Sequence, residues 1–137
     1  MSHLEKIQSF FAAYAAKDVE RVREVMVPDI TWTIPGHHPL AGTKQGIGEV
    51  LAFFDQLGKA GFQAQPLAVA EQGDYVIDHH RGWSEAAGGL DLLWCLVFRF
   101  EGGRIKEVTN FCSDQHEADR FFWRLFPLKP IPGRLAG

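Results

Sequence analysis

Hydrophobic positions near the start of the chain recur at the spacing of an amphipathic helix. Leu4, Ile7 and Phe11 follow one another at intervals of three and four residues, which predicts a helix over about residues 3–16. Ser2 stands three residues before a glutamate, which is the spacing of a helix-capping box. The chain therefore opens with a helix that has one face directed toward a core.

Two more helices are predicted before the pattern changes. Asp18 can cap a short second helix that Pro28 ends, because proline cannot continue the hydrogen bonding of a helix. Residues 46–58 carry hydrophobic side chains at helical spacing, and a glycine follows shortly after them. Between these two helices, a β-branched and aromatic run predicts a short strand over residues 30–34, followed by a proline-rich loop.

From residue 62 onward the pattern is typical of strands. Strands are predicted over residues 62–70, 75–83, 90–100 and 105–112. Pro66 assigns the first of these to a sheet edge or a bulge, since proline cannot donate to a strand ladder. Residues 101–104, Glu-Gly-Gly-Arg, predict a tight hairpin turn, and Asp114 predicts the cap of a last helix.

The order of these elements predicts an α+β fold. We expect a cone-shaped, curved antiparallel β-sheet packed against three N-terminal helices, with a C-terminal helix. Residues 1–126 are predicted to form a single domain. Residues 127–137, which contain three prolines, are predicted to run extended over the surface. The open end of such a cone is a natural place for a ligand.

Composition narrows the classes of function. The net charge is −3 and no basic run occurs, so nucleic acid is not an expected partner. No apolar run reaches the roughly 18 residues of a membrane span, and the N-terminus lacks the apolar stretch of a signal peptide. Cys95 and Cys112 lie in apolar runs, so a cytoplasmic protein with reduced thiols is expected. Eleven phenylalanines and four tryptophans fill a core or surround a pocket for flat apolar ligands.

Several stretches, taken together in this order and spacing, resemble the SnoaL-like and ketosteroid-isomerase-like proteins of the nuclear transport factor 2 superfamily. They are residues 11–20 (FAAYAAKDVE), 28–32 (PDITW), 35–36 (PG), 39–42 (PLAG), 50–54 (VLAFF) and 98–105 (FRFEGGRI). The resemblance covers about residues 4–125. It implies the cone-shaped roll, a cystatin-like arrangement, with an apolar pocket. Because one fold hosts many functions, it implies the fold more specifically than any activity.

The resemblance allows a comparison with the family's enzymes position by position. Ketosteroid isomerases use a tyrosine in the first helix, an aspartate base at the end of the first strand and an aspartate acid on the long strand before the hairpin. The matching positions here are Phe10, Ile34 and Leu96. None of these side chains can transfer a proton, so steroid isomerisation by that route is not expected.

Two other mechanisms of the superfamily lack their central carboxylate as well. Limonene-epoxide hydrolases use a tyrosine and an asparagine on the first strand, an arginine and an aspartate on a middle strand, and an aspartate on the last. The matching positions here are Trp32 and Ile34, then His79 and Arg81, and then Asn110. SnoaL-type cyclases also carry an aspartate where this chain has Asn110. An amide can hold a water molecule but is a poor base for it.

His79, Arg81 and Asn110 are therefore the candidate catalytic residues. Alternation along the strand sends His79 and Arg81 to one face and Asp78 and His80 to the other. The resemblance favours His79 and Arg81 as the pair that lines the pocket, where a histidine beside a fixed cation can act as a neutral base. The alternative is a strand whose polar side chains face solvent or a dimer partner.

The surroundings of Asn110 depend on the hairpin turn before it. A three-residue loop would put Asn110 opposite Trp94, and a two-residue loop would put it opposite Cys95. The functional interpretation is a pocket amide that orients a carbonyl group or a water molecule. The alternative is a structural asparagine bonded to nearby backbone.

The rest of the predicted pocket lining is mainly aromatic and apolar. It consists of Tyr14, Trp32, Ile34, His37, Phe54, Trp94, Leu96, Val108 and Cys112. No histidine, cysteine or carboxylate set has a recognised metal-ligand spacing, and the glycines do not form a phosphate loop. Neither a metal nor a cofactor is therefore expected.

Three interpretations of function stay open. The first is a protein that either only binds a small cyclic hydrophobic compound or acts on it as a non-standard isomerase, cyclase or hydrolase. The compound would be steroid-like, polyketide-like or terpenoid. The second is a non-catalytic dimerisation or protein-interaction module; the resemblance implies a homodimer formed through the outer face of the sheet. The third is a cone that its own aromatic side chains fill.

Overall fold

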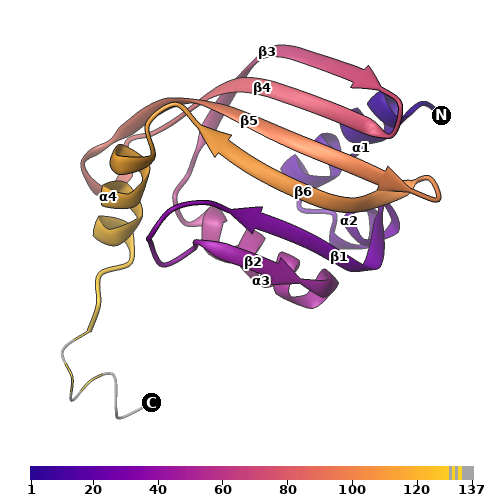
Figure 1. Ribbon diagram of the computed structural model, residues 1–137. Coiled ribbons are helices and arrows are strands. Elements are labelled where there is room, and N and C mark those ends of the chain that lie inside the picture. The colour runs from indigo at the N-terminus through magenta and orange to yellow at the C-terminus, as the bar shows by residue number, and fades with distance from the viewer. Residues whose placement is uncertain (130, 132, 134–137) are drawn as a thin grey trace.

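A single six-stranded sheet organises this chain in the computed structural model, which describes residues 1–129, 131 and 133 (Figure 1). The strands are β1 (Met26–Ile34), β2 (Gly42–Gln45), β3 (Gln63–Gln72), β4 (Tyr75–Ser84), β5 (Leu90–Glu101) and β6 (Arg104–Cys112). Their order across the sheet is β2-β1-β6-β5-β4-β3. Neighbouring strands are antiparallel except β1 and β6, which are parallel.

Helices cover one face of the sheet and one of its ends. They are α1 (His3–Ala15), α2 (Val19–Glu24), α3 (Gly46–Gly58) and α4 (Gln115–Leu125), with a short 3-10 turn, η1 (Ala86–Gly88), between β4 and β5. Ser2, Asp18 and Asp114 cap α1, α2 and α4 as predicted. In Figure 1, α1, α2 and α3 lie behind the sheet, whereas α4 stands at its left end. The predicted α+β fold with three N-terminal helices and a C-terminal helix is confirmed.

Two differences from the predicted strands concern the first edge of the sheet. Strand β1 begins at Met26 rather than at residue 30. Strand β2, which the sequence pattern did not predict, pairs Gly42 to Gln45 with the second half of β1. Its sequence, Gly-Thr-Lys-Gln, has no hydrophobic alternation, because it is an exposed edge strand held by backbone hydrogen bonds. Pro66, by contrast, lies both in an edge strand and next to a shift of register, as predicted.

The turn between β5 and β6 is a two-residue turn. Glu101 pairs with Arg104, so Gly102 and Gly103 form the turn itself. Their φ angles of 59° and 81° are readily adopted only by glycine, and two such residues in succession give the turn that matches the twist of a hairpin.

A β-bulge just beyond this turn decides which side chains of β6 face the core. The pairing of β5 with β6 shifts by one residue there. As a result Asn110 pairs with Leu96, and not with Trp94 or Cys95. Both registers considered from the sequence were therefore wrong, because neither included a bulge.

The core lies between the inner face of the sheet and the helices. Its fully buried side chains include Ile7 and Phe10 of α1, Val50 of α3, and Phe98 and Val108 of the sheet. None of the helices among the described residues is long and apolar enough to cross a membrane. Of the predicted tail, residues 130, 132 and 134–137 lie outside the described residues.

Candidate functional site

Residues 78–81 of β4, Asp-His-His-Arg, are all polar. The two of them that face the core are the pair that the sequence analysis did not favour. Val76 and Ser84, near the two ends of β4, are buried against the core. Asp78 and His80 share their face, because side chains alternate along a strand. Asp78 also pairs with Leu96, a buried core residue of β5. The inner face of β4 therefore presents a carboxylate and an imidazole.

His79 and Arg81 lie on the outer face. Arg81 forms a bidentate ion pair with Asp91, with nitrogen–oxygen distances of 2.9 and 2.5 Å, and its guanidinium lies 4.4 Å from the ring centre of Trp83. Its charge is thus already matched at the surface. The prediction that His79 and Arg81 line the pocket is corrected, since the inward pair is Asp78 and His80.

Asp78 and His80 are joined by a short hydrogen bond. Nδ1 of His80 lies 2.6 Å from Oδ2 of Asp78. Asp78 is only 4% exposed, whereas the His80 side chain keeps 20% of its surface accessible. A carboxylate oxygen accepts, so Nδ1 must carry the proton, and Nε2 of the neutral ring is then an unprotonated acceptor.

Trp94 lies beside this pair and is fixed by a glycine of β4. Trp94 pairs with His80, and its indole nitrogen donates to the Gly82 carbonyl oxygen at 3.1 Å. A β-carbon at Gly82 would lie 2.8 Å from that nitrogen, so a larger residue would displace the indole. Trp94 keeps partial exposure, which leaves an aromatic surface next to the imidazole.

Asn110 reaches the inner face from β6, on the other side of β5. The Trp32 indole nitrogen donates to Oδ1 of Asn110 at 2.8 Å. Leu96 pairs with Asp78 on one side and with Asn110 on the other, so the two polar groups flank one leucine. Strands are spaced about 4.8 Å apart, which separates the two backbones by about 10 Å.

Part of the predicted lining belongs to the packed core. Trp32 is buried among the rings of Phe10, Phe53, Phe54 and Phe98, with ring centres 5.0 to 6.3 Å apart. Ile34, Leu96 and Val108 are buried as well. This aromatic cluster fills the part of the cone that lies under α1 and α3.

Tyr14 and Phe54 stand at the border of that cluster. Their rings meet edge to face, with centres 5.1 Å apart, and both side chains are partly exposed. Burial raises the pKa of the Tyr14 hydroxyl, so Tyr14 stays a phenol at neutral pH and can donate a hydrogen bond.

Cys112 and His37 lie where α4 meets the sheet. The Cys112 thiol donates to Oε1 of Gln115 at 3.4 Å, and burial raises its pKa, which keeps it protonated. His37 contributes through its backbone, since its N–H donates to Asp119 and its carbonyl oxygen accepts from Trp123. The hydrogen bonds of these two residues are with α4 and not with the Asp78–His80 pair, and His37 helps to anchor α4.

Solvent reaches the polar atoms of the inner face. Among the described residues, no fully buried side-chain nitrogen or oxygen lacks a hydrogen-bond partner. Nε2 of His80 and Nδ2 of Asn110 have no partner in that part of the chain, so both must border accessible space. Each of these two atoms therefore keeps some contact with solvent.

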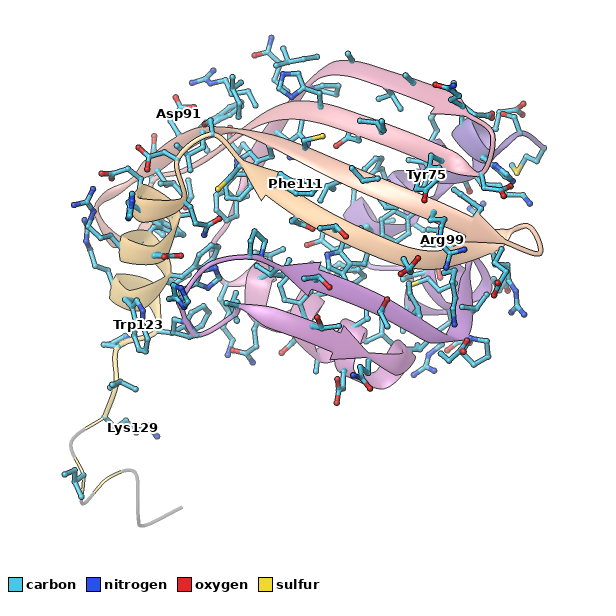
Figure 2. The ribbon with its side chains drawn as sticks, viewed as in Figure 1. Tyr75, Asp91, Arg99, Phe111, Trp123 and Lys129 are labelled. Atoms are coloured by element: carbon cyan, nitrogen blue, oxygen red, sulfur yellow. The ribbon has the colours of Figure 1, made fainter. Side chains whose placement is uncertain are left out.

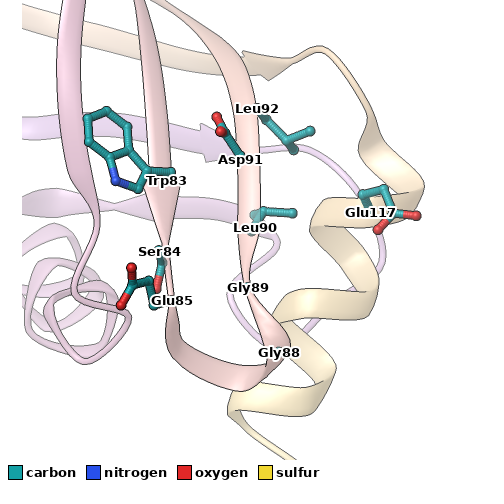
Figure 3. A pocket seen from close by; sticks show the side chains of 9 residues that line it. All are labelled: Trp83, Ser84, Glu85, Gly88, Gly89, Leu90, Asp91, Leu92 and Glu117. Atoms are coloured by element: carbon teal, nitrogen blue, oxygen red, sulfur yellow. The ribbon is translucent and has the colours of Figure 1, made fainter.

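Two hollows also open at the end of the β4–β5 hairpin. The larger has a volume of about 560 Å³ and runs between this hairpin and α4, lined by Trp83, Ser84, Glu85, Gly88, Gly89, Leu90, Asp91, Leu92 and Glu117 (Figure 3). The smaller, of about 320 Å³, shares three of these residues and extends toward the end of α3. Neither is lined by a predicted site residue. The larger is lined by three carboxylates, one of which is paired with Arg81, and by no histidine, so we locate the candidate site at His80 and Asn110 instead.

Sequence reasoning missed Asp78 and His80 for a definite reason. Alternation assigns them to the same face but cannot say which face of the sheet meets the helices. The available signal was their spacing, since an aspartate two residues before a histidine in a strand puts a carboxylate next to an imidazole nitrogen.

The comparisons with known proteins agree with the observed fold. The family model described as the SnoaL-like domain matches residues 7–108. The structure of Bal32a, from a soil-derived mobile gene cassette, is 30% identical, with a TM-score of 0.79 over 86% of this chain and 94% of that chain. A Xanthomonas campestris protein with a cystatin-like fold is 25% identical, with a TM-score of 0.81 over 89% and 98%.

The relatives found by sequence comparison are uncharacterised proteins, so they indicate no activity. An uncharacterised protein of Mycobacterium tuberculosis H37Rv is 26% identical over 125 residues, which span 88% of this chain and 95% of the relative. TerC, at 22% identity and a TM-score of 0.68 over 78% of this chain and 88% of that chain, shares the fold. On the family model and on the likeness to Bal32a, this chain belongs to the SnoaL-like family, within the nuclear transport factor 2-like superfamily.

Proposed function

We propose that this protein binds a small, cyclic, hydrophobic compound against the inner face of its sheet, and that His80 transfers protons to or from that compound. One observation carries the proposal, which is the hydrogen-bonded Asp78–His80 pair on a largely apolar inner face, where the His80 side chain stays partly exposed. Buried polar groups are costly, and a paired carboxylate and imidazole in such surroundings are typical of acid–base sites.

The pair has the chemistry of a base and its support. Asp78 accepts the Nδ1 proton and leaves Nε2 of His80 free to remove a proton from a bound compound. The imidazolium that forms is stabilised by the adjacent carboxylate, and it can return the proton at another atom. Proton shift, ring closure and addition of water all consist of such removals and returns.

The surroundings favour a flat, apolar ligand. Trp94 offers an aromatic surface next to His80, and Tyr14 and Phe54 offer another at the border of the core. TerC, which has the same fold, was co-crystallised with polyporic acid, and this supports a cyclic compound as the ligand class. The positions of the tyrosine and the two aspartates of ketosteroid isomerases hold Phe10, Ile34 and Leu96 here, which leaves the proton transfer to His80.

The test begins with a thermal-shift screen against steroids, aromatic polyketides, terpenoid epoxides and small phenols. A ligand at about a hundred times its dissociation constant should stabilise the fold by about 2.7 kcal/mol. Turnover of the compounds that bind is then measured for the wild type and for His80→Gln, which should lower kcat by about 100-fold to 10,000-fold. Asp78→Asn should lower it as well, because an amide can hold the imidazole in the wrong tautomer.

His79→Gln is the matched control, since it changes a histidine of the same strand on the outer face. It should retain turnover and binding. Equal turnover by wild type and His80→Gln would contradict the role of His80. The absence of a shift with every compound class would contradict the proposed ligand, and the interpretation of a filled or protein-binding cone would then be favoured.

A further inference from the structure

Trp32 fixes the direction in which the Asn110 amide points. The indole nitrogen of Trp32 lies 2.8 Å from Oδ1 of Asn110. An indole N–H can only donate, so the atom that faces it must be the amide oxygen and not the amide nitrogen. The NH₂ group of Asn110 is therefore turned away from Trp32.

The indole itself has little freedom to move. Trp32 is 4% exposed, and four phenylalanine rings pack around it, two of them edge to face. Protein interiors of this kind are close-packed, so the ring cannot turn without displacing its neighbours. The Trp32 donor thus holds Asn110 in one of its two possible flips.

The amide nitrogen is left as a donor without an acceptor from the described residues. Across the sheet, Asn110 pairs with Leu96 of β5. On its other side lies Ile34 of β1, one residue beyond the pair of Thr33 with Thr109. The side chains of Leu96 and Ile34 are both buried. The nitrogen is not fully buried, because no fully buried side-chain nitrogen or oxygen of the described chain lacks a partner. A ligand that covers this donor without accepting from it would leave an N–H unpaired, which is costly.

We infer that Trp32 is a positioning residue that presents the Asn110 amide N–H to the ligand, and that the ligand carries a carbonyl-type oxygen to accept it. This inference rests on the proposed function, since it concerns the same inner face. The backbones of β4 and β6 stand about 10 Å apart, so a compound of about two fused rings has the length to reach from Asn110 toward His80. The ligand class is thus narrowed from a cyclic apolar compound to an aromatic or alicyclic ketone of about two rings.

A pair of isosteres tests the inference. 2-Acetylnaphthalene and 2-isopropenylnaphthalene have the same shape, but the first has an oxygen where the second has a CH₂ group. The wild type should bind the ketone about tenfold more tightly, as measured by titration calorimetry. Asn110→Leu should bind the two equally, and Asn110→Asp should prefer the alkene, because a carboxylate repels the ketone oxygen.

Trp32→Phe should retain Asn110 but lose most of the preference for the ketone, because nothing then fixes the flip of the amide. Trp94→Phe is its matched control on the same face, and it should change both affinities by the same factor. A readout that needs no substitution is the ¹⁵N-correlated NMR signal of the Asn110 side-chain NH₂, which should move with the ketone and stay with the alkene. This signal decides the matter if Trp32→Phe does not fold.

Each outcome has a distinct meaning. Equal affinities of the wild type for both compounds, with an unmoved Asn110 NH₂ signal, would overturn the role of Trp32 and Asn110 and leave His80 in place. A failure of both compounds to bind, in a protein that also gives no thermal shift with the wider panel, would overturn this inference together with the proposed function. A ketone preference that survives in Asn110→Leu would overturn the assignment of the donor.

Discussion

Two polar side chains on the inner face are each held by a neighbour that leaves one atom free. Asp78 binds Nδ1 of His80 and leaves Nε2, and Trp32 binds Oδ1 of Asn110 and leaves Nδ2. A group that is already fixed loses little conformational freedom when a ligand binds to it. Cys112 differs, because its thiol is bonded to Gln115 and its raised pKa keeps it a weak nucleophile at neutral pH.

His38, in the loop between β1 and β2, is a buried residue whose arrangement depends on its charge. Its ring stacks on Phe122 at 4.5 Å, and its Nδ1 accepts a hydrogen bond from the Leu40 N–H at 3.1 Å. That bond requires an unprotonated Nδ1. Burial lowers the pKa of His38, the charge of Asp119 opposes that effect, and the charge of Lys44 adds to it.

We expect stability to fall as His38 becomes protonated. The folded protein binds this proton more weakly than the unfolded chain does, so the contribution is complete above about pH 6.5 and is lost as the pH falls through the lowered pKa of the folded state. Thermal unfolding measured from about pH 7.5 to about pH 5 should show a decrease in Tm across this window.

His38→Phe separates this effect from other titrations. Phenylalanine keeps the stacking on Phe122 but cannot be protonated and cannot accept from Leu40, which costs about 1 kcal/mol at neutral pH. The variant should therefore start less stable and lose less stability on acidification. Parallel decreases of Tm in the variant and the wild type would assign the pH dependence to other groups.

Helix α4 buries Phe121 and Phe122 in the core and is also hydrogen-bonded to the loop between β1 and β2. Gln115 and Asp119 bind each other at 2.8 Å, Gln115 donates to the Pro35 carbonyl oxygen at 3.3 Å, and the Trp123 indole donates to that of His37 at 2.7 Å. Gly36 lies at the centre of these contacts. Its φ of +101° and its lack of a side chain let α4 approach the loop closely.

Gly36→Ala should loosen the docking of α4. An added β-carbon would lie 2.2 Å from Nε2 of Gln115 and 2.3 Å from Oδ1 of Asp119, so the ends of these two side chains must move and their contacts with the loop are lost. Gly42→Ala is the control, since it has a similar φ of +104° and nothing within 4 Å of the added carbon. Urea unfolding should show backbone strain of about 1–3 kcal/mol in both variants and a further loss of about 1–3 kcal/mol in Gly36→Ala alone. Equal losses would mean that α4 does not depend on this contact.

The positions of the helices and strands along the chain could be predicted from the sequence better than which face of each strand is buried. Strong periodicity and caps located α1, α3 and α4 closely, with α3 matching its predicted bounds of 46–58. The orientation of His79 was wrong because a strand has two equivalent phases until something else shows which one is covered. The partner of Asn110 was wrong because a bulge leaves no mark in the hydrophobic pattern.

Considered as a whole, the molecule has an apolar patch on the outer face of its sheet. Tyr75, Ile77, Leu93 and Phe111 are 44–50% exposed there, and Tyr75 and Phe111 can be seen on the face toward the viewer in Figure 2. Pairing puts Val97 beside Ile77 and Cys95 beside Phe111, so the patch is continuous across three strands. Contiguous apolar patches of this kind are typical of contact surfaces.

We expect a second copy of this chain to cover that face. The charged side chains near the patch are already matched within one chain, Arg99 with Glu107 and Arg81 with Asp91, so two copies can meet without an unpaired charge. Light scattering should give a mass of about 31 kDa, twice the 15.4 kDa of one chain.

Phe111→Lys should reduce that mass to the value of one chain, because a charge at the centre of an apolar contact is costly. Val19→Lys is the control, since it changes an equally exposed apolar residue on α2, away from the sheet face. A wild type with the mass of one chain at micromolar concentration would contradict the expected dimer.

The bulge in β6 lets this strand change its length without changing which side chains face the core. The one extra residue there allows Ile105 and Val108, three positions apart, both to be buried, whereas strict alternation would turn Val108 and Asn110 to the exterior and Phe111 to the interior. Loss of that unpaired residue would remove the bulge and leave the pairs beyond it, and the faces of their side chains, unchanged. Relatives that differ in length at this turn should therefore be compared by the face of the sheet on which each residue lies, and not by sequence alignment alone.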